Sequence, residues 1–396
     1  MSRERTKIFV EAIPLVAERP SGISYAVLGL VSALANDPAL QERYEVVLVA
    51  PKRGLHLLDR WPSLQGCTRK GLPLRMRIIQ GLMRVHMLPP MDLLLGRGVY
   101  LFGNFMNWKV TKRSVSLTYI HDIAFALFPH FVSPKLQRML MAKVPGFIAQ
   151  TDYVITVSES SKQEIVEHFA VPDTKVLVLY NGVDAATYRP YGQTEVRRVK
   201  AKYDITKPYF LFVSSIEPRK NVQRLVEAFA ALPEGYSLVI VGGSGWLNED
   251  TLATIERLRQ QGVSIIKPSQ YVPNDEVSIL MSGAVALVHP AFHEGFGMPP
   301  AEAMACGVPA IVSDIPSLRE VTGDAGIYCD PQDTGSITAA MRQVLSLSPA
   351  ERTSITKKGI IRAKQFSWEK SAVMLGDFLD TKVKSEGIRD GGTQGL

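Results

Sequence analysis

The chain alternates short apolar runs with longer segments in which apolar residues recur every three or four positions. The runs have the length of strands buried on both faces, and the longer segments have the period of amphipathic helices. Ser158, Ser160 and Ser161 stand where the N-cap of one such helix is expected. This alternation predicts an α/β fold built on parallel sheets. In the first half we predict strands at residues 7–10, 45–50, 100–102, 115–120, 153–157 and 176–180, and helices at 25–35, 134–149 and 160–169.

The pattern is interrupted once and then restarts. Residues 184–207 are polar and charged, which predicts a linker followed by the first helix of a second unit. Two β/α halves of similar size, with a cleft between them, are therefore expected. Residues 385–396 hold four glycines and few apolar residues, and we expect them to be disordered. In the second half we predict strands at residues 209–213, 238–241, 263–266, 285–289, 310–313 and 326–329.

The most informative stretch covers residues 293–309 and reads HEGFGMPPAEAMACGVP. It follows a predicted strand that ends near His289, so it begins at the carboxyl edge of a sheet. Pro299 and Pro300 suit the first turn of a helix, where a missing N–H group costs little. Gly307 supplies the usual left-handed end of that helix. The stretch therefore predicts a strand, a glycine-bearing loop and a helix.

Two glutamates of this stretch are predicted to face one ligand. Gly295 and Gly297 let the loop backbone approach a ligand closely, and the helix start offers free N–H groups and a positive dipole end. Glu294 is expected on the loop and Glu302 in the first helical turn, so both face the crevice in which open α/β sheets bind ligands. An isolated pair of this kind would more simply be a solvated loop residue and a helix-dipole carboxylate. The glycine, proline and alanine context favours a site in which each carboxylate binds two sugar hydroxyls.

Composition and charge narrow the class of protein. The 396 residues are 46% hydrophobic and 21% charged, as in a globular protein with two sizeable domains. The formal net charge of +7 favours anionic partners, but no basic stripe with interleaved aromatic residues indicates nucleic acid. Three scattered cysteines do not suffice for a disulfide framework or a zinc site. Because the chain shows no secretory segment and no membrane-spanning stretch, we expect a cytoplasmic protein.

The stretch at 293–309 resembles the E-x7-E signature of a large family of retaining glycosyltransferases with the GT-B fold, family 4 of group 1 type. Four other segments are similar to motifs of that family: YIHD at 119–122, NGVD at 181–184, FLFVSSIEPRKN at 210–221 and FSWE at 366–369. The resemblance covers roughly residues 7–382 and is most specific in the second half. It implies two Rossmann-like β/α/β domains facing a central cleft. Residues 1–187, with a crossover helix at 369–384, would bind the acceptor, and residues 188–368 would bind the nucleotide sugar.

The resemblance assigns the main contacts of the donor. Arg219 and Lys220 would hold the diphosphate, where fixed cations stabilise the leaving charge. Family members often carry Gly-Arg where this chain has Ser-Ser at 214–215, so Arg219 has to serve that phosphate role together with Lys220. Glu302 would bind the ribose hydroxyls, and Glu294 would bind the transferred sugar.

Five further residues complete the predicted donor site. Backbone N–H groups of Phe296, Gly297 and Met298 would help to hold the sugar and the diphosphate. Gly243 belongs to a GGSG run after a strand and either lines the nucleotide or simply forms a turn. Val272 stands where the family binds the base through its backbone.

Three residues of the first half are predicted to face the donor site across the cleft. His121 would lie close to the transferring sugar, where its backbone or ring supports the developing oxocarbenium ion, although a lone histidine is more often structural. Asp122 is expected to orient that turn. Gly22 resembles the family's glycine loop, which contacts the diphosphate or the acceptor.

These assignments predict a retaining, metal-independent hexosyltransferase in which His121, Glu294, Arg219 and Lys220 act on the reacting groups. No D-x-D metal element is present, no cofactor is expected, and the donor β-phosphate would accept the acceptor's proton during front-face attack. GDP-mannose is the first donor expected, with UDP-glucose and UDP-N-acetylglucosamine left open. The acceptor would be a saccharide or lipid-linked molecule of cell-envelope or exopolysaccharide biosynthesis. A non-catalytic nucleotide-sugar-binding subunit and an epimerase or phosphorylase are the alternatives, and no pyridoxal-binding site supports the last.

One segment of the first half raises the question of a membrane. Residues 69–84 read RKGLPLRMRIIQGLMR and combine five cations with an apolar face. A basic amphipathic segment of this kind either lies in an anionic membrane surface or packs as a helix on its own sheet. Both interpretations stay open, and the first implies peripheral contact with the inner face of a membrane.

Overall fold

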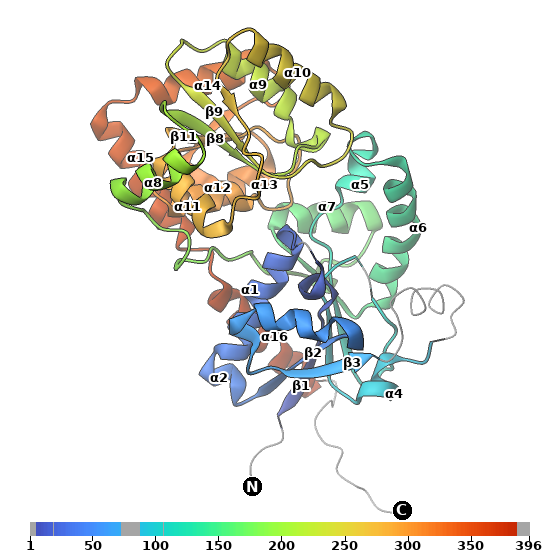
Figure 1. The fold of residues 1–396 in the computed structure, drawn as a ribbon. Helices are drawn as coiled ribbons and strands as arrows, with labels where there is room; N and C mark the ends of the chain where they lie inside the picture. Colours follow the sequence, from blue (N-terminus) through green and yellow to red (C-terminus); the bar gives the residue numbers. More distant parts are fainter. Residues whose placement is uncertain (1–4, 19, 73–87, 106, 386–396) are drawn as a thin grey trace, which may run out of the picture.

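The computed structural model describes residues 5–18, 20–72, 88–105 and 107–385 (Figure 1). Their strands form two parallel sheets, one in each half of the chain. Figure 1 shows the two halves as separate bodies that meet near helix α7 (Glu159–Phe169). The α/β fold with two parallel-sheet halves that the hydrophobic pattern predicted is therefore present.

Sheet A, in the first half, has seven strands in the order β3-β2-β1-β4-β5-β6-β7. Val10 of the central strand pairs with Leu48 on one side and Leu101 on the other. The strands are β1 (Thr6–Glu11), β2 (Tyr44–Pro51), β3 (Thr68–Leu72), β4 (Val99–Phe102), β5 (Val115–Tyr119), β6 (Tyr153–Thr156) and β7 (Val176–Val178). The other helices of this half are α1 (Gly22–Asn36), α2 (Pro38–Gln41), α4 (Met91–Leu95), α5 (Ala124–Leu127) and α6 (Pro134–Gln150).

Sheet B, in the second half, has six strands in the order β10-β9-β8-β11-β12-β13. They are β8 (Tyr209–Val213), β9 (Ser237–Val241), β10 (Ile265–Ile266), β11 (Ala286–His289), β12 (Ala310–Ser313) and β13 (Gly326–Cys329). The helices around them are α8 (Gln193–Lys202), α9 (Val222–Ala230), α10 (Glu249–Gln260), α11 (Asn274–Gly283), α12 (Met298–Ala305), α13 (Pro316–Thr322), α14 (Thr334–Ser346) and α15 (Pro349–Ala363).

The central strands of both sheets are apolar almost throughout because helices cover both faces. Phe210, Leu211 and Phe212 of β8 have no exposed surface, and their side chains point alternately into two apolar clusters on opposite faces of sheet B. A strand that is buried on both sides needs a continuous hydrophobic run instead of alternation. This is why short apolar runs located these strands in the sequence.

The last helix, α16 (Trp368–Ser385), returns to the first half of the chain. Its first residue packs so closely on α1 that a side chain at Gly29 would meet the Trp368 indole. Further along the helix, the Tyr44 hydroxyl donates to the Gly376 carbonyl over 3.1 Å. Helix α16 therefore completes the layer on sheet A after the chain has built the whole of sheet B.

Strand β3 differs from the sequence prediction. Arg69 and Lys70 lie in this strand, which pairs with β2 through Leu48 and Val49, and the sequence suggested a basic amphipathic helix there. The prediction failed because RKGL has no alternation and few β-branched residues, so only the neighbouring strand organises it. The rest of the segment, residues 73–84, lies outside the described residues, as does the tail at 386–396.

Candidate active site

Each sheet reverses its strand order at one point, and ligands of open α/β sheets bind at such points. In sheet B the reversal lies between β8 and β11, because the chain passes from β8 to β9 on one side and returns to β11 on the other. The loops that follow these two strands carry Arg219, Lys220 and Glu294. The topology thus brings together residues that are more than seventy positions apart in the chain.

Arg219 and Lys220 lie in a single helical turn, η6 (Pro218–Lys220), between β8 and α9. The next residue, Asn221, is left-handed with φ 57°, and its side-chain amide donates to the carbonyls of Pro290 and Pro331 over 2.9 and 2.7 Å. Asparagine tolerates this backbone region better than most residues. Asn221 therefore fixes the turn that presents the two cations to the loop after β11.

The Glu294 carboxylate lies between both cations. Arg219 Nη1 is 3.1 Å from Glu294 Oε2, and Lys220 Nζ forms a short ion pair with Glu294 Oε1. Arg219 also donates to Glu217 Oε1 over 3.1 Å and lies 3.9 Å from Asp122 Oδ2 of the first half. The three carboxylates more than neutralise the two cations, so the cluster is internally compensated without a ligand.

Burial and neighbouring charges shift the pKa of Glu294 in opposite directions. Burial by itself would raise the pKa of Glu294, but Lys220, Arg219 and the hydrogen bond from His289 hold that pKa well below its usual range. Burial, reinforced by Arg219, lowers the pKa of Lys220. A buried carboxylate stays ionised only with such partners. Glu294 is accordingly a fixed negative charge at neutral pH.

His289, the last residue of β11, contacts the Glu294 carboxylate. Its Nε2 lies 2.6 Å from Glu294 Oε1, and its ring is parallel to that of Phe212 at 6.0 Å. Burial lowers the pKa of His289, so the ring is neutral and donates one hydrogen bond to the carboxylate.

Two glycines allow the loop after Glu294 its shape. A side chain at Gly295 would meet the His121 carbonyl of the first half. Gly297 precedes α12 with φ 97°, a left-handed conformation, and a side chain there would meet Leu318. The close approach and the positive φ together explain why the loop needs glycine at both positions.

Glu302 has an environment opposite to that of Glu294. It is 9% exposed, and burial raises its pKa to about 7, although a hydrogen bond from Tyr188 lowers the value in part. Glu302 is the fifth residue of α12 and lies in the second helical turn, not in the first turn as predicted. No cation compensates it among the described residues.

The first half contributes His121 and Asp122 after β5. His121 Nε2 lies 3.1 Å from the Gly103 carbonyl, and burial lowers its pKa, so the neutral ring donates this bond. Asp122 Oδ1 accepts from the Ala124 N–H over 3.0 Å, the geometry of a residue that orients its own turn. Burial raises the pKa of Asp122, but Arg219 and His293 outweigh this and leave it below the ordinary value.

Helix α7 of the first half holds the same loop from the other side. Ser158 Oγ and Ser161 Oγ lie 2.6 and 3.2 Å from the Gly295 carbonyl, and Glu164 pairs with His293 at 3.0 Å. Glu320 of α13 accepts from the first two N–H groups of α7 over 2.7 and 3.0 Å. The loop after β11 of the second half is thus also bound to side chains of the first half.

The remaining predicted residues, all of them among the described residues, form no ion pair or hydrogen bond with the Glu294 carboxylate. The Gly243 carbonyl accepts from the Ile216 N–H over 3.1 Å, beside the turn that carries Arg219. Val272 and Phe296 are buried in apolar clusters, so only their backbones are available to a ligand. Two others stand at helix starts: Gly22 is the first residue of α1, and Met298 is the first residue of α12.

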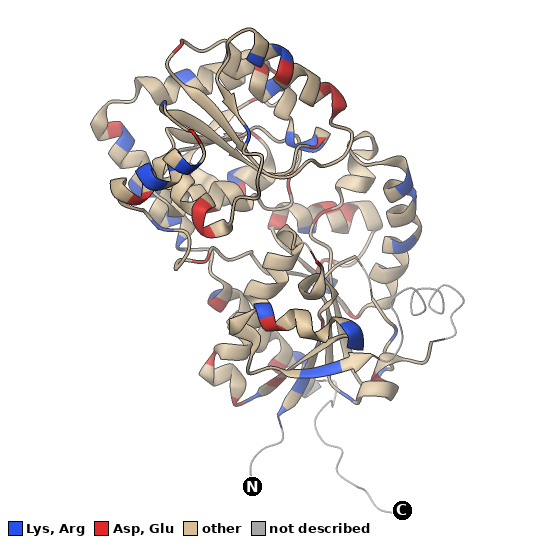
Figure 2. Ribbon diagram, in the orientation of Figure 1, with Lys and Arg blue, Asp and Glu red and all other residues tan. Residues whose placement is uncertain are grey.

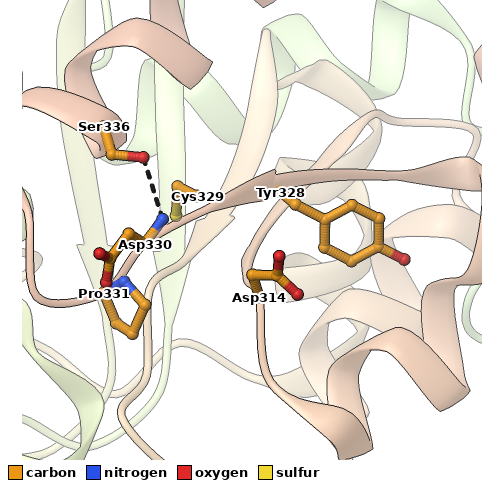
Figure 3. A pocket seen from close by; sticks show the side chains of 6 residues that line it. All are labelled: Asp314, Tyr328, Cys329, Asp330, Pro331 and Ser336. Carbon is orange, nitrogen blue, oxygen red and sulfur yellow. Dashed lines mark hydrogen bonds between the residues drawn. The ribbon is translucent and has the colours of Figure 1, made fainter.

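A separate cavity of about 400 Å³ opens at the ends of β12 and β13 (Figure 3). Figure 3 shows Asp314 and Tyr328 on one side, and Asp330, Pro331 and Ser336 on the other. Asp314 is paired with Arg319, and the Asp330 N–H donates to Ser336 Oγ over 2.9 Å. None of the sequence-predicted site residues lines this cavity.

Among the described residues no group of His, Cys, Asp and Glu side chains converges to hold a metal ion, and metal independence stays a prediction.

Sequence reasoning missed His289, Glu217 and Glu320. Glu217 was visible inside the phosphate motif, where a buried acid before two cations indicates pairing. A histidine at the end of an otherwise apolar strand was also a readable signal. Glu320 could not be identified, because its partners lie about 160 positions away.

The chain is similar to known glycosyltransferases in sequence and to solved structures in fold. Two family models match the chain: Glycosyltransferase Family 4 over residues 21–187, and Glycosyl transferases group 1 over residues 193–362. O-antigen chain mannosyltransferase B of Escherichia coli is 33% identical over 259 residues, which are 64% of this chain and 67% of that protein. The serotype-specific mannosyltransferase WbdA of Escherichia coli is 28% identical over 66% of this chain, and the match spans about a third (33%) of WbdA. The structure of HepE from Anabaena with UDP and glucose superposes with a TM-score of 0.70 at 16% identity, covering 96% of this chain and 100% of HepE.

The fold and the paired sheet edges define a GT-B protein. Within that class, the chain belongs to the group 1, family 4 glycosyltransferases. The predicted family, fold and hexosyltransferase class are thereby confirmed. No helix among the described residues is both long enough and apolar enough to cross a bilayer.

Proposed function

We propose that this chain is a retaining mannosyltransferase that uses GDP-mannose, without a divalent cation, in the cytoplasmic synthesis of an O-antigen-like polysaccharide. The observation that carries the proposal is the placement of Glu294 between Arg219 and Lys220, against a loop shared with His121 of the other half. Two related proteins are named mannosyltransferases, which favours mannose as the transferred sugar. HepE, solved with UDP and glucose, keeps a UDP-sugar as the alternative donor.

The donor diphosphate would take the place that the Glu294 carboxylate now holds beside the two cations. A diphosphate compensates both cations and so favours the charged form of Lys220, whose pKa is lowered in the free protein. Glu294, released from them, would accept hydrogen bonds from hydroxyls of the transferred sugar. Backbone N–H groups at Phe296, Gly297 and Met298, at the start of α12, would face the same donor.

Glu302 and Tyr188 would bind the ribose, with Gly243 and the backbone of Val272 beside the nucleotide. A carboxylate accepts two vicinal hydroxyl hydrogen bonds, and the ionised form does this better than the acid. Because the pKa of Glu302 is about 7 in the free protein, donor binding would release a proton near neutral pH.

The transfer itself needs no protein nucleophile in this proposal. The acceptor oxygen forms a bond to the anomeric carbon as the bond from that carbon to the β-phosphate oxygen breaks, and the acceptor's proton passes to the departing phosphate. Arg219 and Lys220 stabilise the charge that develops there. The His121 carbonyl and neutral ring would lie where positive charge develops on the sugar, and Gly22 at the start of α1 would face the diphosphate or the acceptor.

The acceptor would be a saccharide, free or carried on a lipid. Lys and Arg colour strand β3 and helix α6 in Figure 2, and Met139 and Met141 of α6 are 42% and 37% exposed. Basic and apolar side chains on one element favour peripheral contact with anionic lipid. Flotation with anionic and neutral vesicles tests this contact, and equal binding to both would contradict it.

The deciding experiment measures nucleoside diphosphate release from a panel of GDP- and UDP-sugars, with and without EDTA, for wild-type and Glu294→Ala protein. Turnover of GDP-mannose that survives EDTA and collapses in the variant is the expected result. Turnover of a UDP-sugar alone would replace the donor, and loss with EDTA would contradict metal independence. Binding of a donor without turnover, in the presence of saccharide acceptors, would favour a non-catalytic binding subunit. The anomeric configuration of the product, read by NMR, tests retention.

A further inference from the structure

Strand β11 ends in a histidine although its other residues, Ala286, Leu287 and Val288, are apolar. His289 has no exposed surface, and its ring faces Phe212 in a parallel stack. A leucine or phenylalanine at this position would satisfy the packing without bringing a polar group into the core. Packing alone therefore does not account for an imidazole at this position.

The two ring nitrogens of His289 have different surroundings. Nε2 lies 2.6 Å from Glu294 Oε1, whereas Nδ1 is buried without a hydrogen-bond partner among the described residues. The neutral ring donates from Nε2, so a bare lone pair remains on Nδ1. An unsatisfied buried polar atom is unfavourable, and such atoms often have a functional cause. Among the described residues, the Glu294 carboxylate is the only hydrogen-bond partner of this side chain.

Glu294 has three partners, and two of them are cations that a diphosphate would claim. Arg219 and Lys220 would turn toward phosphate when the donor binds, which leaves a buried carboxylate without its counter-charges. His289 lies at the end of a central strand and cannot follow the phosphate. It would keep its hydrogen bond to Glu294 while the other two partners change.

We propose that His289 is a positioning residue, which holds the Glu294 carboxylate toward the transferred sugar once Arg219 and Lys220 bind the diphosphate. This inference rests on the proposed function, because it needs a donor that carries both groups. It implies that His289 matters for a nucleotide that bears a sugar and not for the nucleoside diphosphate alone. Misplacement of a contact by about 1 Å can lower a rate by about a hundredfold.

The test compares His289→Leu, which keeps the size and removes the N–H donor, with His289→Gln, whose amide places a donor near the position of Nε2. For His289→Leu we expect kcat with GDP-mannose to fall by tenfold or more, with the dissociation constant for GDP, measured by calorimetry, within about twofold of wild type. The Gln variant should recover most of the lost kcat. Ser313→Ala is the matched control, because it removes a buried hydroxyl without a partner from the end of the neighbouring strand β12.

Three outcomes would overturn the assignment: an unchanged kcat in folded His289→Leu, an equal loss of GDP affinity, or no recovery in folded His289→Gln. Thermal unfolding of every variant shows whether it is folded. If the donor panel selects a UDP-sugar, the same design uses UDP in place of GDP. Absence of turnover in wild-type protein would instead contradict the proposed function, so the two failures are distinguishable.

Discussion

At the carboxyl edge of sheet A, the buried Glu11 and His121 hydrogen-bond to the backbone, whereas at the same edge of sheet B the buried Glu294 is paired with other side chains. Glu11 ends β1 and accepts from the Ile13 N–H over 2.8 Å, and burial raises its pKa to about 7. His121 donates to the Gly103 carbonyl, and burial lowers its pKa. Across the interface, Glu294 is equally buried, but two cations and His289 keep its pKa far below the usual range.

The comparison shows that burial alone does not decide the charge of a site. The same desolvation raises the pKa of an isolated acid and lowers the pKa of an isolated base, and only a partner of opposite charge reverses these shifts. The edge of sheet B can therefore bind an anion, and its two cations stay paired with carboxylates until an anion binds. The edge of sheet A is close to neutral and suits uncharged hydroxyls, apart from Asp122, which faces Arg219.

The largest effect is expected from removing a cation of sheet B. For Arg219→Met, kcat/KM for the donor should fall on the order of 1,000-fold, because a fixed charge on the leaving group is lost. Release of nucleoside diphosphate measures the change. Arg224→Met is the control, since Arg224 packs over the Phe292 ring, 5.3 Å from its centroid, without contacting Glu294. A loss below tenfold would mean that the charged edge does not bind the leaving group.

The pH dependence of stability separates a carboxyl group without a cation from one that has them. Because the folded pKa of Glu302 is about 7 against a usual 4.5, its favourable contribution is full below pH 4.5 and lost as the pH rises through 7. Between pH 5 and pH 8, the unfolding free energy of Glu302→Gln should therefore rise by about 2–3 kcal/mol relative to that of wild type in chemical unfolding. Glu11→Gln tests the same effect in sheet A.

Glu294→Gln should change stability in the opposite window, because the contribution of a group with a lowered pKa is lost as the pH falls below 4.5. The exposed Glu167→Gln of α7 is the control for all three glutamate variants. If the unfolding free energies of Glu302→Gln and wild-type protein changed equally with pH, the difference between the two carboxyl environments would be contradicted.

Glu294→Gln should also separate transfer from nucleotide binding. Transfer should fall about 100-fold with the loss of the sugar contact, whereas GDP should bind several-fold more tightly, because Arg219 and Lys220 are no longer held by a carboxylate. Calorimetry with GDP and turnover with the donor measure the two effects. Glu164→Gln, which alters the His293 contact of the same loop, is the control. Weaker GDP binding in Glu294→Gln would exclude the carboxylate as a placeholder for phosphate.

The smallest effect is expected where α13 of the second half contacts α7 of the first half. Glu320→Ala removes acceptors for two N–H groups of α7 and for the Tyr180 hydroxyl at 2.8 Å. Unfolding free energy should fall by about 1–2 kcal/mol, and the radius of gyration in solution should increase. Asp324→Ala, on the exposed turn after α13, should change neither. An unchanged radius in Glu320→Ala would mean that other contacts hold the halves together.

The sequence predicted the two sheets and the loop with Glu294 because both depend on local signals. Apolar runs identify doubly covered strands, and glycines with a helix start identify a ligand loop. Strand β3 was missed because its pairing with β2 lies in tertiary structure and not in its own residues. Arg219 and Lys220 were predicted as separate contacts of a donor, and their direct pairing with Glu294 became visible only in the folded chain.

Helix α16 has a consequence for the order in which the protein is made. It covers α1 and reaches Leu40, yet it follows all of sheet B in the chain. A ribosome adding about 5–20 residues per second releases sheet A well before its last covering helix. During that interval the face of α1 that receives Trp368 is uncovered, and the first domain can become complete only when synthesis has passed through the second.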